Sequence, residues 1–204
     1  MHYISTDDPK LEQYLPIVKE YEAVVNFCIG EHKYLIPVLN YFSTEVYPNV
    51  EYYQEVNDDH VYISEAWDVN LVQTLKDHGG WGIAYPFNTV NSVPSSSVFS
   101  GNIIRALGFF NPPCFRHTWA DDWTHRLGRA FNFIYFRKDI VIDHRCWHDT
   151  VNGIGARAPK DSNADFVYGA EEYAYGCSAQ AHYMVHQWHS DIAKLKLAME
   201  KNNG

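Results

Sequence analysis

Apolar and polar positions along the chain follow two patterns, one typical of strands and one typical of helices. Short β-branched or aromatic runs between polar residues predict strands, and apolar residues three and four apart predict helices. The predicted strands are 2–6, 23–30, 50–57, 81–87 and two short runs, 131–136 and 139–144. The predicted helices are 9–21, 33–47, 65–77, 102–107, 121–131 and 178–201. Strands and helices therefore alternate through the first half of the chain.

This alternation predicts the fold class. Strands that alternate with helices are typical of an α/β domain with a mostly parallel sheet flanked by helices. A long C-terminal helix over about 178–201 would complete it. The sequence contains no internal repeat and no low-complexity linker, so we expect residues 1–204 to form a single domain.

Composition narrows the class of protein. The 204 residues are 46% hydrophobic and 16% aromatic, which is typical of a folded globular chain. The formal net charge of −9 disfavours broad attraction to nucleic acid or to an anionic membrane, because both bind proteins through neutralised phosphates. A local basic groove stays compatible with this charge.

Cysteine spacing and the N-terminal sequence predict the compartment. The four cysteines are widely spaced and form no CxxC pair, which indicates neither a disulfide scaffold nor a structural zinc site. The first ten residues lack the basic and apolar segments of a signal peptide. No window approaches the roughly 18 apolar residues of a membrane span. We expect a cytoplasmic protein.

Two acidic residues follow the predicted strand 50–57. Asp58 and Asp59 lie in the segment Asn-Asp-Asp-His, at a strand end where ligands of parallel α/β sheets gather. Adjacent carboxylates are costly to crowd together unless a cation compensates them, and such oxygen ligands suit Mg²⁺ or Mn²⁺ bridging phosphates. The alternative is that both aspartates only begin the turn before the next helix.

Two further segments offer chemistry. The strand 139–144 ends at His144, with Asp143 beside it, and a lone histidine there is commonly structural. Asp121 opens a predicted helix, where an acid is favoured by the helix dipole and by capping. The functional alternative for Asp121 is a carboxylate that accepts a proton from an attacking hydroxyl.

A group of histidines lies in the predicted C-terminal helix. His182, His186 and His189 share one helical face, a spacing compatible with a metal site. The helix lacks the HExxH motif that supplies a general base in zinc hydrolases. A metallohydrolase therefore stays an alternative to surface histidines beside an apolar stripe.

Taken in order, these motifs resemble those of the GT-A glycosyltransferases, especially short family-2-like proteins of bacteriophages. The likeness extends from about Tyr3 to His148. The matching segments are Asp7-Asp8-Pro9 after a strand, the NDDH segment, Trp67-Asp68, Pro94, Ala106-Leu107-Gly108, His117 with Asp121, and Asp143-His144. Each motif is short, and their order and spacing carry the resemblance.

The resemblance implies a role for each matching residue. Asp7 or Asp8 would contact the base or ribose of a nucleotide-sugar donor, by default a UDP-sugar, and Asp58 would face the ribose. Asp59 and His144 would hold Mn²⁺ or Mg²⁺ on the diphosphate. In an inverting enzyme, Asp121 would activate the acceptor hydroxyl. The acceptor would be a glycan, a small molecule or a modified DNA base, and a phage protein of this kind would act in the host cytoplasm.

The sequence departs from this family at two places. Members usually begin with a further strand and helix before the position of His2. The final motif has Cys146 where a second histidine is common, with His148 as a substitute. The first departure supports an alternative function, a catalytically inactive module that binds a sugar nucleotide or a partner.

Overall fold

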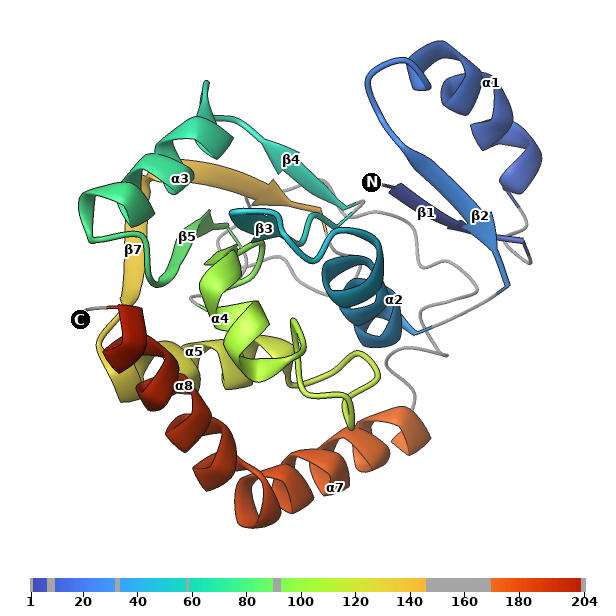
Figure 1. The fold of residues 1–204 in the computed structure, drawn as a ribbon. Coiled ribbons are helices and arrows are strands. Elements are labelled where there is room, and N and C mark those ends of the chain that lie inside the picture. The colour runs from blue at the N-terminus through green and yellow to red at the C-terminus, as the bar shows by residue number, and fades with distance from the viewer. Residues whose placement is uncertain are drawn as a thin grey trace.

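A βαβ unit forms the N-terminal part of the structure, a computed structural model that describes residues 2–6, 10–31, 34–57, 59–89, 93–145 and 170–202 (Figure 1). β1 (His2–Ser5) pairs in parallel with β2 (Phe27–Gly30), and α1 (Leu11–Tyr21) connects them. α1 contains no buried residue. This unit is a separate two-stranded sheet beside the main body of the molecule.

A five-stranded sheet forms the centre of the main body. The strands in spatial order are β3 (Tyr52–Gln54), β6 (Val98–Ser100), β5 (Ile83–Asn88), β7 (Ile134–His144) and β4 (His60–Tyr62). β5 and β7 are parallel, whereas the β3–β6, β5–β6 and β4–β7 pairs are antiparallel. The α/β class is confirmed, but the expectation of a mostly parallel sheet is wrong. The short strands β6 and β4, which the pattern does not predict, insert antiparallel pairs.

β7 corrects a second expectation. The polar residues Arg137 and Lys138 separate two apolar runs and were expected to lie between two strands. They belong instead to one strand, whose register against β5 shifts between Pro86 and Phe87. The shift takes up the extra residues as an irregularity of the ladder, so the chain continues to His144 without a turn.

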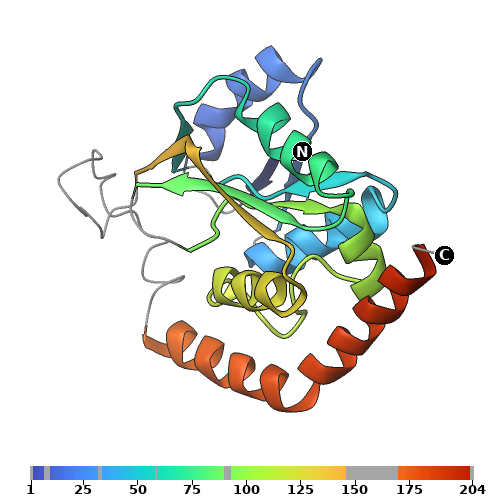
Figure 2. The same ribbon diagram turned by 90° about the vertical axis from the view of Figure 1, so that its left-hand side faces the viewer.

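Helices cover both faces of this sheet, and neighbouring strand residues show which face is which. Ala84 and Val98 pack with Leu71 and Leu75 of α3 (Trp67–Asp77) on one face. Ile83 and Phe99 point the opposite way, because successive strand residues alternate between faces. The second face is covered by α4 (Gly101–Leu107), α5 (Ala120–Phe131) and the C-terminal helices (Figure 2). α2 (Leu35–Tyr41), which continues as the π-helix η1 (Phe42–Val46), also packs there.

The C-terminal segment is helical, as expected, but it consists of two helices. α7 (Ala170–His186) and α8 (Trp188–Asn202) meet at Gln187, and α8 packs against α4. Tyr183 and Leu195, one on each helix, belong to the same buried cluster. A single straight helix would not place both residues in this cluster. The chain therefore changes direction between α7 and α8 (Figure 1).

Candidate metal centre

The pairing of β4 with β7 brings a histidine from each strand to one end of the sheet. In this antiparallel ladder His60 lies directly opposite His144, and their ring centroids are 4.3 Å apart. Asp59 precedes β4, and its carbonyl accepts a hydrogen bond of 2.8 Å from the backbone N–H of Arg145. The ladder therefore brings three polar side chains together. Asp59 and His60 come from one segment, and His144 comes from another about 85 residues later.

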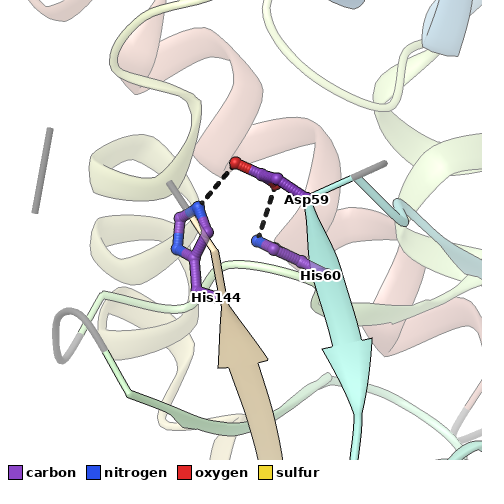
Figure 3. A group of neighbouring side chains, drawn as sticks. All are labelled: Asp59, His60 and His144. Carbon is purple, nitrogen blue, oxygen red and sulfur yellow. Dashed lines mark hydrogen bonds and ion pairs between the residues drawn. The ribbon is translucent and has the colours of Figure 1, made fainter. Parts of the chain in front are cut away.

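The carboxylate of Asp59 lies between the two imidazoles (Figure 3). Its Oδ2 is 3.1 Å from Nε2 of His144, and its Oδ1 is 3.7 Å from Nε2 of His60. The candidate ligand atoms of the three residues all lie within 4.8 Å of one another. Among the described residues, this is the one group of three or more side chains with the spacing of a metal site.

Polar side chains at the end of β5 and in the following turn orient both histidines. Nδ1 of His60 is hydrogen-bonded to the hydroxyl of Ser96, and Nδ1 of His144 is 3.1 Å from the side-chain amide of Asn88. Asn88 is also 2.6 Å from the hydroxyl of Ser95. With the Asn88 amide rotated so that Oδ1 faces His144, it accepts the Nδ1–H that a metal-bound imidazole carries. Such outer contacts are typical of metal-ligating histidines.

His60 carries a buried nitrogen without a partner. The residue is 7% exposed, and its Nε2 has no hydrogen bond among the described residues. Burial, together with the charge of His144, lowers the pKa of His60 to about 4, despite the opposing effect of Asp59. The ring is therefore neutral at physiological pH, and its Nε2 lies beside the carboxylate of Asp59. A buried imidazole nitrogen without a hydrogen bond, next to a carboxylate, fits a bound cation.

The carboxylate of Asp59 is ionised over the whole physiological range. Burial alone would raise its pKa, but the hydrogen bond to His144 and the nearby imidazoles outweigh burial and lower it. The centre thus combines one carboxylate oxygen with the imidazole nitrogens of two histidines. This donor set suits borderline divalent transition metals better than Ca²⁺.

Three further titratable groups surround this centre. Glu55 follows β3, His117 precedes α5, and Asp121 lies in the first turn of α5; all three are half-buried. Burial and the charge of Asp122 raise the pKa of Asp121 to about 6, while His144 opposes the rise. Burial and the charge of Asp121 raise the pKa of Glu55 to about 8. Electrostatic interactions link Asp121 to His144, His117 to Asp59 and Glu55 to Asp121, so these half-buried side chains lie near the metal centre.

Asp121 does not act as a helix cap. α5 begins after Trp119, whose side chain makes no capping hydrogen bond, and Asp121 is already inside the helix. Its electrostatic interaction with His144 shows that its side chain lies near the metal centre. The structure thus brings together Asp59, His144 and Asp121, which the sequence singled out in three separate segments. Their roles stay predictions.

The other residues singled out from the sequence divide into two groups. Asp7, Asp8 and Asp58, as well as Cys146 and His148, lie outside the described residues. His182, His186 and His189 are all exposed, and although the first two rings are 4.5 Å apart, the three do not form a group with metal-site spacing. Glu55 was missed, and His60 and His117 were named only as parts of motifs, without a role. The signal for His60 was its place in the NDDH segment, but the strand β4, which orients its side chain, was not predicted.

Comparison of the chain with protein-family models, with curated proteins and with solved structures finds no match. The described part of the chain also has no helix with the length and apolar character needed to cross a bilayer. The function therefore has to be inferred from the geometry of the site.

The raised pKa of Glu55 predicts a pH-dependent stability. Between its ordinary value of 4.5 and about 8, the folded state holds a proton that the unfolded state has lost, so stability falls as pH rises. His60 and His117, with pKa values lowered to about 4, have the opposite effect, but only below about pH 6.5. From pH 6.5 to 8 the fall is at most about 1.4 kcal/mol per pH unit.

Urea unfolding of metal-free protein at pH 6.5, 7.2 and 8 measures this slope. We expect the Glu55→Gln variant, which keeps a neutral side chain of the same size at all three pH values, to lose the slope. An equal slope in the two proteins would contradict the assignment of the proton to Glu55.

Proposed function

We propose that this protein transfers a sugar from a nucleoside diphosphate sugar to an acceptor hydroxyl, with the help of a divalent cation. One observation carries the proposal. Asp59 and His144 lie 3.1 Å apart at adjoining strand ends, and Asp121, a half-buried carboxyl, interacts electrostatically with His144. A cation ligand pair beside a proton acceptor is the arrangement that departure of a diphosphate and attack by a hydroxyl require.

The fold supports the same class in a coarser way. A parallel βαβ unit is followed by a sheet in which Asp59 comes after β3 and His144 ends β7. This order of elements is compatible with the GT-A-like assignment, which we retain as part of the proposal. The central sheet pairs its strands mostly antiparallel, and in this it differs from the mostly parallel sheet that the resemblance implies.

Each side chain has a definable task. Asp59 and His144 would hold the cation, which when bound would offset the negative charge that grows on the leaving diphosphate. Asp121 would accept the proton of the acceptor hydroxyl as the bond to the sugar forms. A carboxyl with a pKa near 6 is ionised at neutral pH, and it is more basic than an ordinary aspartate.

The choice of substrates follows the family resemblance and the charge of the chain. A UDP-sugar is the default donor, with a glycan, a small molecule or a modified DNA base as acceptor. The net charge of −9 disfavours a large footprint on nucleic acid. A catalytically inactive module that binds the same nucleotide is the second candidate, and turnover separates it from an enzyme.

Calorimetric titration with UDP, with and without Mn²⁺, tests the proposal. We expect Mn²⁺-dependent binding in the wild type and a loss of at least tenfold in affinity in Asp59→Asn, because a neutral amide is a much weaker metal ligand. Asp77→Asn, which alters an exposed carboxylate of α3, is the matched control and should bind as the wild type does.

Incubation with a panel of UDP-sugars, followed by assay of released UDP, tests turnover. Wild-type protein that shows no Mn²⁺-dependent UDP binding would refute the proposed function. Binding without release of UDP in the presence of glycan and hydroxymethylated DNA acceptors would support the inactive module instead.

A further inference from the structure

We propose that Nε2 of His60 is a third protein ligand, so that Asp59, His60 and His144 hold a transition-metal cation even without a nucleotide. This inference deepens the proposed function, because it names the class of cation and the ligands at the same site. Sugar transfer as proposed above requires only Asp59 and His144. The two ideas can therefore fail separately.

The separations of the donor atoms fit one shared cation. Ligand atoms at about 2.0–2.2 Å from a common metal ion lie about 3–4 Å from one another. The Asp59–His144 separation of 3.1 Å and the Asp59–His60 separation of 3.7 Å fall within that range. The Asp59–His60 pair is an electrostatic contact that is too long for a hydrogen bond.

The unpaired nitrogen of His60 distinguishes a ligand from a structural histidine. A histidine that only fills space in the core would have its polar atoms paired, since an unpaired buried acceptor costs about 1–3 kcal/mol. Here Nδ1 is held by Ser96, whereas Nε2 is buried, has no hydrogen bond among the described residues and points toward the carboxylate of Asp59 (Figure 3). A cation at this point would satisfy it.

The supporting contacts of the two histidines are alike. The hydroxyl of Ser96 orients His60, and the amide of Asn88 orients His144, both from the segment that ends β5 and leads into β6. In each case a polar side chain contacts Nδ1, and Nε2 faces the carboxylate of Asp59. This shared support fixes the orientation of both rings before any cation arrives, which reduces the cost of binding.

The donor set selects the cation. Two imidazole nitrogens and one carboxylate oxygen suit Zn²⁺, Co²⁺ or Mn²⁺, whereas Mg²⁺ prefers oxygen ligands and retains its waters. We therefore expect Co²⁺ and Zn²⁺ to bind the metal-free, nucleotide-free chain with one site per molecule. Millimolar Mg²⁺ should displace neither.

Titration of the metal-stripped full chain with Co²⁺, followed by visible absorption, tests the inference. We expect His60→Ala to weaken Co²⁺ binding by at least tenfold, and Ser96→Ala to weaken it less. His78→Ala, which removes an exposed histidine at the end of α3, is the matched control and should leave the titration unchanged. A folded His60→Ala protein, checked by circular dichroism, that binds Co²⁺ as tightly as the wild type would overturn the inference.

A second measurement uses the wild-type protein and does not depend on how the variant folds. Imidazole N–H protons of histidines bound to paramagnetic Co²⁺ shift far outside the usual proton range. Two such exchangeable signals are expected, one from each histidine, and a single signal would overturn the inference. Co²⁺ binding without Mn²⁺-dependent UDP binding would refute sugar transfer alone, whereas UDP binding that requires Mn²⁺, without any binding of metal alone, would refute the three-ligand centre alone.

Discussion

Replacing Asp121 with asparagine is expected to slow sugar transfer by about 10²- to 10⁴-fold, the usual contribution of a general base. Asparagine keeps the size of the side chain but cannot accept a proton. The variant should still bind UDP and Mn²⁺ as the wild type does, because Asp121 is not one of the two proposed cation ligands, Asp59 and His144. Steady-state release of UDP at saturating donor and acceptor measures the loss.

The pH profile of this reaction provides an independent check. Asp121 acts as a base only when ionised, so turnover of the wild type should fall as pH drops below about 6. Asp122→Asn is a matched control from the same helical turn. Removing this neighbouring charge should move the acid limb to lower pH and leave the plateau unchanged, since Asp122 raises the pKa of Asp121. Wild-type turnover in Asp121→Asn would contradict the assignment.

Replacing Trp123 with alanine is expected to lower the free energy of unfolding by about 3–5 kcal/mol, a large part of the stability of a typical domain. Trp123 is 1% exposed and lies on α5, two residues after Asp121. Its Nε1–H donates to the hydroxyl of Tyr183 at 3.2 Å, and that hydroxyl donates to Asp191 at 3.0 Å. The substitution creates a large cavity and also interrupts this chain of hydrogen bonds between α5, α7 and α8.

Urea unfolding monitored by circular dichroism measures the effect. Trp123→Phe, which keeps much of the ring volume but not the N–H donor, should be destabilised by clearly less than the alanine variant. Val185→Ala alters a side chain of α7 that is 70% exposed and should change stability by less than about 0.5 kcal/mol. A loss below 1 kcal/mol in Trp123→Ala would show that α5 is not held by this core.

These two predictions describe connected parts of the molecule. The buried side of α5 packs against the C-terminal helices through Trp123 and Leu127. The first turn of the same helix places Asp121 near His144. A weakened core would therefore allow Asp121 to move relative to Asp59. We expect a conservative core variant that folds to bind Co²⁺ normally, because the metal centre depends on β4, β5 and β7 and not on α5.

Local sequence signals predicted many of the elements well. The apolar spacing of 65–77 and 121–131 corresponds to α3 and α5 within one or two residues, because helical periodicity depends on neighbours in the chain. Asp59 and His144 were singled out because each was expected at the end of a strand. His144 does end β7, whereas β3 ends at Gln54 and Asp59 instead precedes β4.

Strand pairing was not visible in the same way. The alternation of strands and helices predicted a mostly parallel sheet, but β6 lies antiparallel between β3 and β5, and β4 lies antiparallel to β7. β4 and β6 each have three residues, which is too short for a periodic pattern. Their positions depend on partners distant in sequence, and hydrogen bonding between such partners leaves no local signature.

The sequence by itself indicated the candidate site residues: the aspartates of the NDDH segment, the histidine that ends the strand 139–144, and Asp121 at the start of its helix. Only the tertiary structure decided that His60 lies with Asp59 and His144, and that Glu55 and His117 lie near this group. The physical reason is that a residue type is a local property, whereas a metal centre depends on the register between two strands. In this protein, the pairing of His60 with His144 across β4 and β7 establishes that register.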